Sequence, residues 1–207
     1  MDIEIREYRE SDYSRCAALV GEAWQFDSVF KPAEFTELAK DLYTGGSLIE
    51  SSFKSVAVSN GEVVGFLFGI HRVAPGTGLH LLFRLKMVWR FYRIRNASPN
   101  KNDLIKALSA HEKNRSPWVP RKRNEIALFV VAKPFKGRGV GTALWRAFLA
   151  TCARAGETEI FVETNKAGAS GFYEQLGFTH LADFDSPLHR IATPEGVACL
   201  YVHHSAA

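Results

Sequence analysis

Residues 126–142 read IALFVVAKPFKGRGVGT. The apolar run 126–132 predicts a buried strand, a glycine-rich turn follows it, and the apolar-periodic stretch 143–153 predicts a helix. Glycines let backbone N–H groups approach an anion closely, and the start of a helix carries a partial positive charge. We therefore expect either a phosphate-binding loop or a plain strand-to-helix turn at this point.

The spacing of the glycines argues against two common phosphate motifs. Gly137, Gly139 and Gly141 alternate, whereas a P-loop needs GxxxxGK[ST]. A dinucleotide fingerprint, GxGxxG, would need glycine at position 142 or 144, where the chain has Thr142 and Leu144. The sequence therefore predicts neither of these nucleotide sites.

The rest of the chain predicts a mixed sheet covered by helices. The pair Asn60-Gly61 joins two β-rich runs and is a strong hairpin signal. From residue 126 onward the predicted order is β-α-β-α followed by further strands, which favours an α/β or α+β fold over a bundle or an all-β barrel. The expected strands are 3–8, 55–58, 63–70, 126–132, 159–163, 178–184 and 197–202, and the expected helices are 11–24, 33–42, 79–95, 103–114, 143–155 and 167–176.

Length and composition limit the classes of protein to consider. The 207 residues, 46% hydrophobic and 23% charged, suit one folded domain over 1–207. Cys16, Cys152 and Cys199 are widely spaced and odd in number, so neither a disulfide framework nor a zinc site is predicted. The N-terminus is charged and has no signal-peptide core, and no apolar run reaches the roughly eighteen residues of a membrane span. We expect a cytoplasmic protein that needs no metal.

Positive charge is concentrated in one segment. Residues 72–124 hold 13 Lys+Arg and two acids, Asp103 and Glu112, for a net charge of +11, whereas the remainder carries −7. Pro75-Gly76 opens this segment, and LLFRLKMVWRFYRIR (81–95) predicts an amphipathic basic helix within it. The expected apolar face is Leu82, Leu85, Trp89 and Tyr92, and the expected basic face is Lys86, Arg90 and Arg93.

Two motifs resemble those of the GNAT superfamily of acyl-CoA-dependent N-acetyltransferases. The family's principal motif is a strand followed by Gln/Arg-x-x-Gly-x-Gly/Ala, and this chain has Lys136-Gly137-Arg138-Gly139-Val140-Gly141. Lysine in the first position keeps the charge but lacks the guanidinium fork. The second motif is an Asn before a helix that ends in Tyr-Glu-x-x-Gly-Phe. It is similar to Asn165, one residue farther away than usual, and Phe172-Tyr173-Glu174-Gln175-Leu176-Gly177-Phe178.

The resemblance implies a fold and a donor site. The fold is a mixed, mostly antiparallel central sheet flanked by helices, with the basic segment, about 73–122, inserted between the third and fourth strands. The cosubstrate is acetyl-CoA, whose pyrophosphate would bind backbone N–H groups at a helix N-terminus, while the preceding strand exposes its backbone to the pantetheine arm. The implied binding residues are Phe129, Val130, Val131, Lys136, Gly137, Arg138, Gly139, Val140, Gly141, Thr142, Asn165, Phe172 and Tyr173.

The implied reaction is direct transfer of an acetyl group to a primary amine of a small molecule or peptide. It needs two proton movements, because the amine must be neutral to attack and the departing thiolate must be protonated. Tyr173 matches the family's acid for the CoA sulfur, and Glu125 matches a common family glutamate that would act as base. Glu163, at the end of the neighbouring strand, is the rival base, and a water is a third candidate. Cys152 is expected to be a core residue rather than a nucleophile.

The basic insertion has several open interpretations. Its aromatic residues, Trp89, Phe91, Tyr92 and Trp118, suggest a gate for an anionic or peptide-like acceptor. The plain alternative is a solvated cationic face over a helix that completes the core. A nucleic-acid-binding or membrane-surface protein on a GNAT scaffold is the runner-up function, although we expect neither nucleic acid nor an integral membrane segment as partner. A homodimer is left open.

Overall fold

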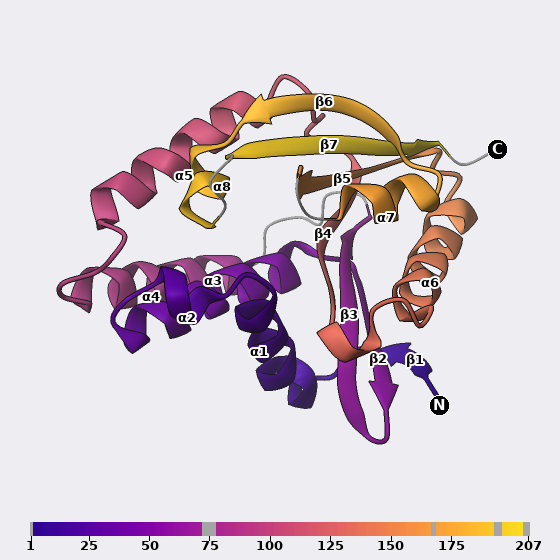
Figure 1. The fold of residues 1–207 in the computed structure, drawn as a ribbon, viewed down its shortest axis with the longest axis horizontal. Helices are drawn as coiled ribbons and strands as arrows, with labels where there is room; N and C mark the ends of the chain where they lie inside the picture. Colours follow the sequence, from indigo (N-terminus) through magenta and orange to yellow (C-terminus); the bar gives the residue numbers. More distant parts are fainter. Residues whose placement is uncertain (1, 72–77, 167–168, 193–195, 205–207) are drawn as a thin grey trace.

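The computed structural model describes residues 2–71, 78–166, 169–192 and 196–204, and its centre is one seven-stranded sheet (Figure 1). The strands are β1 Glu4–Glu7, β2 Phe53–Ser59, β3 Glu62–Ile70, β4 Asn124–Val131, β5 Glu159–Asn165, β6 Thr179–Asp185 and β7 Val197–His204. Their order is β1-β2-β3-β4-β5-β7-β6, and all neighbours are antiparallel except β4 and β5. The expected mixed, mostly antiparallel sheet is therefore confirmed.

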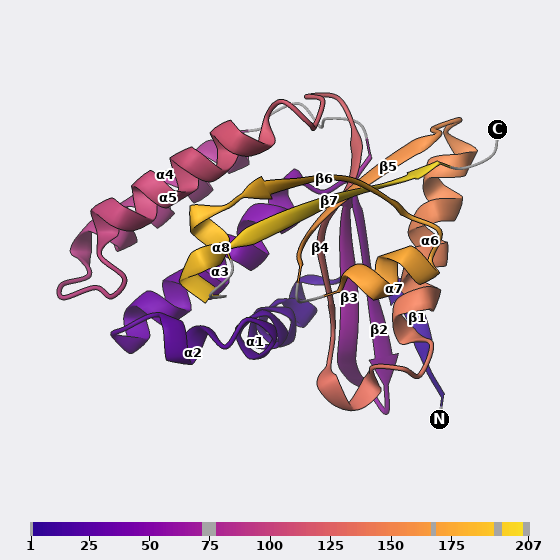
Figure 2. The ribbon, with the colours of Figure 1, turned by 45° about the horizontal axis from the view of Figure 1, so that its top comes forward.

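Helices cover both faces of the sheet. They are α1 Tyr13–Ala23, α2 Phe26–Val29, α3 Ala33–Glu50, α4 Gly78–Arg93, α5 Lys101–Arg115, α6 Val140–Arg154, α7 Ser170–Gln175 and α8 Pro187–Ala192. In both ribbon views α6 and α7 lie on one side of the sheet, and α1 to α5 with α8 lie on the other (Figures 1 and 2). Each side has its own apolar core, the first around Leu144 and Phe148 and the second around Leu38 and Phe66.

Local signals explain where several elements begin and end. Asn60 and Gly61, with φ of 51° and 81°, form the predicted hairpin turn between β2 and β3. Gly156 and Gly177 take positive φ of 73° and 86° just after α6 and α7, as expected for helix ends. The predicted basic insertion lies between β3 and β4 and holds α4 and α5, although Pro75-Gly76 falls outside the described residues.

Several elements differ from the prediction. Helix α3 continues from 42 to Glu50 through Gly45, because that glycine serves a close helix contact rather than a helix end: a Cβ there would lie 2.7 Å from the Phe83 ring of α4. Strand β5 continues from 163 to Asn165 by pairing with β7. The short helix α8 is not predicted at all, since six residues are too few to show a helical period.

The predicted apolar face of α4 exists but does not meet the core. Phe83 and Phe91 pack against the core on the α3 side, and Met87 is buried in it. Arg90, assigned to the basic face, donates a hydrogen bond to Asp41 of α3. The residues of the predicted apolar face, Leu82, Leu85, Trp89 and Tyr92, are all exposed. The segment contains two apolar stripes, and the helical period alone cannot show which of them meets the core.

Strands β4 and β5 separate at their C-terminal ends. They pair only over Asn124–Ile126 and Ile160–Val162, although β4 continues to Val131 and β5 to Asn165. A bulge in β4 lies at the same place: the pairing with β3 shifts between Ile126 and Leu128, which leaves one extra residue in β4. Beyond this point the facing backbone edges of 127–131 and 163–165 make no ladder with each other in the described chain. The two strands are therefore unpaired over these edges, and we call this unpaired stretch between β4 and β5 the opening.

Candidate active site

The glycine-rich turn joins the open end of β4 to the start of α6. Gly137 and Gly139 have φ of 72° and 78°, in the left-handed region that glycine adopts without strain. The first hydrogen bond of α6 runs from the N–H of Ala143 to the carbonyl of Gly139, at 2.9 Å. The N–H groups of residues 140–142 precede this bond and lie at the positive end of the helix. This geometry suits an anion.

The first turn of α6 lies against the aromatic side chains of β4 and α7. A Cβ added to Gly141 would lie 2.9 Å from Cζ of Phe172, so this glycine permits close approach. The ring of Phe172 packs edge-on against Phe129, with centroids 5.7 Å apart. Lys136 and Arg138 are exposed on the same turn. The two family motifs therefore meet in space, with positive charge at their outer edge.

The residues expected along the pantetheine arm lie beside the opening in the sheet. Phe129 and Val131 turn their side chains toward the α6 side, and Val130 is buried in the core on the other side. Asn165 is the last residue of β5 and pairs with Ala198 of β7. The three residues expected along the pantetheine arm thus lie on β4, and the expected cofactor-binding residue Asn165 lies on the facing strand β5.

Tyr173 lies in α7, within the core on the α6 side. It is 5% exposed, and its ring packs edge-on against Phe172 and Phe178, with centroids 5.5 and 5.4 Å apart. Burial raises the pKa of Tyr173 above its ordinary value. The hydroxyl therefore keeps its proton at neutral pH, as a general acid must.

Arg115 of α5 joins the two carboxylates that compete as base. Its guanidinium donates to Oε1 of Glu125, and its Nε donates to Oε2 of Glu163 at 2.8 Å. The second oxygen of Glu125 accepts a hydrogen bond from Arg123. Glu125 is buried, and each of its two oxygens accepts a hydrogen bond from an arginine. Glu163 keeps Oε1 for other partners.

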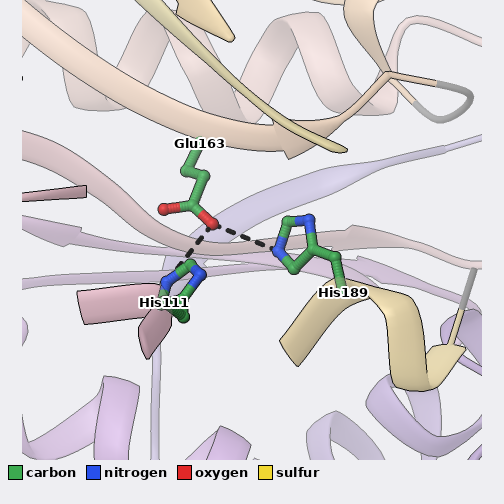
Figure 3. A group of neighbouring side chains, drawn as sticks. All are labelled: His111, Glu163 and His189. Carbon is green, nitrogen blue, oxygen red and sulfur yellow. Dashed lines mark ion pairs between the residues drawn. The ribbon is translucent and has the colours of Figure 1, made fainter. Parts of the chain in front are cut away.

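Two histidines from separate helices contact that remaining oxygen (Figure 3). Oε1 of Glu163 lies 3.1 Å from Nε2 of His189 in α8 and 3.6 Å from Nε2 of His111 in α5. The two imidazole rings are stacked, with centroids 5.6 Å apart. Nδ1 of His111 lies 2.9 Å from the hydroxyl of Ser186, which accepts a hydrogen bond from the backbone N–H of His189. We call His111, Glu163 and His189 the histidine–glutamate cluster.

The electrostatics of the histidine–glutamate cluster favour an ionised carboxylate beside a neutral imidazole. Burial alone would raise the pKa of Glu163, but the hydrogen bond from His189 and the charges of His111 and Arg115 outweigh it, so this pKa is lowered. Burial lowers the pKa of His111, against the opposing charge of Glu163. Burial and the same carboxylate raise the pKa of Tyr43 of α3 to about 12. At neutral pH Glu163 is therefore ionised, and His111 is a neutral imidazole that can accept a proton.

The same cluster has the donor types of a divalent-cation site. One donor atom from each residue lies within 4.8 Å of the others, and two histidines with a carboxylate are ligands that Zn²⁺ uses. Arg115, however, already binds Glu163, and its positive charge opposes a second cation at this carboxylate. The arrangement fits proton uptake better than metal binding.

Sequence reasoning missed His111, His189 and Arg115. Each lies in a helix with no motif around it, and α5 meets α8 only through the tertiary packing of the insertion. Glu163 was recognised as a strand-end carboxylate, but its partners come from 48 residues before it and 26 after it. No local pattern links such positions.

A separate cavity lies between α1, α3 and α4. Its volume is about 270 Å³, and the insertion contributes to its wall. It has no lining residue from the glycine turn or from the histidine–glutamate cluster. We therefore assign neither donor binding nor chemistry to it. The lining residues are Tyr13, Asp41, Gly45, Leu48, Ile49, Phe83, Lys86 and Met87.

Comparison with known proteins agrees with this geometry. Residues 118–185 match the family model described as "Acetyltransferase (GNAT) domain". This third of the chain therefore resembles a GNAT acetyltransferase domain. The matched range includes β4, the glycine turn, α6, β5 and α7, so it covers both motifs and the opening between the strands.

The individual proteins that the chain resembles share either a short stretch of sequence or a low overall identity with it. N-alpha-acetyltransferase 30 of Schizosaccharomyces pombe (strain 972 / ATCC 24843) is 38% identical over 58 residues, which is 27% of this chain and 39% of that protein. The chain thus matches about two fifths of the length of that curated relative. The crystal structure of SsHAT is 16% identical with a TM-score of 0.67, and each chain is covered completely. The NatC complex bound to Gag peptide and CoA is 15% identical with a TM-score of 0.53, again over both whole chains. These structural likenesses show the GNAT fold.

Two further expectations concern the cysteines and membrane-spanning helices. Cys16, Cys152 and Cys199 are buried free thiols, and burial raises the pKa of Cys152 to about 11, so it is a poor nucleophile. Among the described helices, none has the length and apolar character needed to cross a membrane. A cytoplasmic location stays a prediction.

Proposed function

We propose that this chain transfers an acetyl group from acetyl-CoA to a primary amine by direct attack, using the whole of 1–207 as one domain with an insertion over about 73–122. The observation that carries the proposal is the opening between β4 and β5. Tyr173 lies in the core on one face of the sheet, and Glu163 contacts α5 and α8 on the other. A thioester held in this opening would meet an acid from one side and a proton acceptor from the other.

The donor end of the site rests on backbone geometry. The N–H groups of 140–142 and the left-handed glycines Gly137 and Gly139 suit the pyrophosphate of acetyl-CoA. Lys136 and Arg138 add positive charge, although lysine cannot make the two-pronged contact of an arginine. The backbone edge of 127–131 suits the amide groups of the pantetheine arm. The CoA in the structurally similar NatC complex supports this donor.

The transfer step requires no covalent acyl-enzyme. The lone pair of the neutral amine attacks the thioester carbonyl carbon, the C–S bond breaks, and the thiolate takes the hydroxyl proton of Tyr173. The histidine–glutamate cluster receives the proton that the amine gives up. This proton binds an imidazole, because the pKa of Glu163 is lowered. Glu125, held by Arg115 and Arg123, fixes the position of Arg115 rather than accepting this proton.

The acceptor side of the proposal points to a peptide-like amine. The cluster takes His111 from α5 of the insertion and His189 from α8, so residues outside the common motifs surround the proton acceptor. The similarity to N-alpha-acetyltransferase 30 supports an α-amino group at a peptide N-terminus as the first acceptor to test. A small-molecule amine is the alternative, and a panel of both distinguishes them.

Gly141→Val is expected to weaken acetyl-CoA binding by about tenfold or more, because its side chain would enter the space of Phe172 and displace the first turn of α6 from the phosphate position. Titration calorimetry with acetyl-CoA measures the effect. Gly46→Ala in α3, where a Cβ meets nothing within 4 Å, is the control. Equal affinities of Gly141→Val and the wild type would refute the phosphate cradle.

Tyr173→Phe is expected to lower kcat by about 10²-fold while leaving the dissociation constant for acetyl-CoA nearly unchanged, since only the transferable proton is removed. Because burial raises the pKa of Tyr173, its ionisation should not limit the alkaline side of the wild-type pH profile. Tyr201→Phe, which removes a hydroxyl bound to Glu174 on the same side of the sheet, is the matched control. Full activity of Tyr173→Phe across the pH range would remove its role as acid.

A further inference from the structure

An apolar stripe on α4 faces solvent. Six large apolar side chains of this helix are between 51% and 70% exposed, whereas single exposed apolar residues are the normal case on a protein surface. At about 100° per residue they fall within an arc of about 120°, which leaves the opposite side for Phe83 and Met87 to pack on the core. The stripe consists of Leu81, Leu82, Leu85, Val88, Trp89 and Tyr92.

Cations border the stripe on both sides. Arg84 lies next to one edge and Lys86 with Arg93 next to the other, and all three are exposed. The guanidinium carbon of Arg93 lies 4.4 Å from the centre of the Trp89 ring. The sequence of α4, GLHLLFRLKMVWRFYR, contains no acidic residue. An apolar face with aromatic residues and flanking arginines and lysines is typical of helices that lie in the plane of a membrane interface.

We propose that this stripe docks the protein on an anionic lipid surface, with α4 lying flat and its leucines among the acyl chains. Charge complementarity selects this occupant. A second copy of the chain would bring two helices that carry only positive charge against each other. A nucleic acid would match the cations and could stack on Trp89 and Tyr92, but it offers nothing that buries four aliphatic side chains. A bilayer of anionic lipids satisfies both the charge and the apolar area.

Vesicle co-sedimentation of the full chain tests the proposal. Wild-type protein should sediment with phosphatidylcholine vesicles containing about one third phosphatidylserine and should stay in solution with pure phosphatidylcholine. Leu82→Ser/Leu85→Ser should lower the partition coefficient by about tenfold or more. Arg84→Gln/Arg93→Gln should lower it by about tenfold and reduce its dependence on salt.

Matched variants control for general effects on solubility and charge. Leu181→Ser removes an exposed leucine on β6, and Arg146→Gln/Arg154→Gln removes two exposed arginines on α6. Both should bind vesicles like the wild type, and thermal melts should show all variants folded. The proposal is wrong if anionic vesicles capture no protein, or if the α4 and control variants bind equally. It is also wrong if the leucine variant only dissociates a dimer in light scattering, or if oligonucleotides bind and only the arginine variant loses them.

Discussion

Glu163→Gln is expected to lower kcat by about 10²- to 10³-fold, because the histidine–glutamate cluster then loses the carboxylate that both imidazoles face. Glutamine is nearly isosteric and can still accept a hydrogen bond from Arg115, so the position of α5 should change little. Acetyl-CoA should bind with unchanged affinity, since Glu163 lies on the opposite face from the glycine turn. Steady-state kinetics and calorimetry separate the two effects.

The pH profile gives this prediction a second readout. Because the pKa of Glu163 is lowered, its carboxylate stays ionised as the pH falls, and an imidazole is the group that becomes protonated first. The wild-type kcat/KM should therefore decrease only at pH values below the ordinary imidazole pKa of about 6.5, because burial lowers the pKa of His111. Glu163→Gln should shift this acidic limb to lower pH, because His111 loses the charge that stabilises its protonated form. Unchanged turnover together with an unchanged acidic limb would exclude Glu163 as part of the proton acceptor.

Glu125→Gln is expected to act mainly on stability, lowering the free energy of unfolding by about 3 kcal/mol. The carboxylate is buried and accepts hydrogen bonds from Arg115 and Arg123, so its neutralisation leaves two poorly solvated guanidinium groups with a single remaining carboxylate, Glu163. For a chain of 207 residues this corresponds to a fall in Tm of about 6–12 °C. Thermal and urea unfolding measure it. Glu62→Gln, on the exposed hairpin end of β3, should leave Tm unchanged.

Glu125→Gln also decides whether Glu125 or Glu163 acts as the base. A large loss of stability with kcat reduced much less than in Glu163→Gln would support a positioning role for Glu125, which holds Arg115 against Glu163. An unchanged Tm with turnover lost would instead assign the base to Glu125, as the family resemblance implies. Measuring both variants at a temperature where each is fully folded prevents unfolding from being read as lost catalysis.

The elements that form the proposed donor site could largely be predicted from the sequence. Strand, glycine turn and helix over 126–154 are local in the chain, and their signals of apolar run, alternating glycines and helical period act over short distances. The hairpin at Asn60-Gly61 is equally local, because positive φ at two successive positions needs such residues. These elements were predicted within a few residues of their observed bounds.

The packing of α4, α5 and α8, which lie on the proposed acceptor side, could not be predicted in the same way. The face of α4 that meets α3 depends on which of two apolar stripes packs better, which only tertiary contacts decide. His111 and His189 approach Glu163 because α5 and α8 pack together over the end of β5, and nothing near either histidine indicates this. Arg115 joins two glutamates on neighbouring strands for the same reason. Packing between distant segments produced each of these features.

The most direct test of the proposed reaction is the release of free CoA thiol from acetyl-CoA in the presence of amines, with peptides of varied N-terminus and small amines in one panel. We predict thiol release that matches acetylated product one for one, favours peptide N-termini, and falls by about 10²-fold or more in Glu163→Gln. No thiol release above the amine-free rate with any acceptor, from protein that binds acetyl-CoA in calorimetry, would contradict the proposed acetyl transfer.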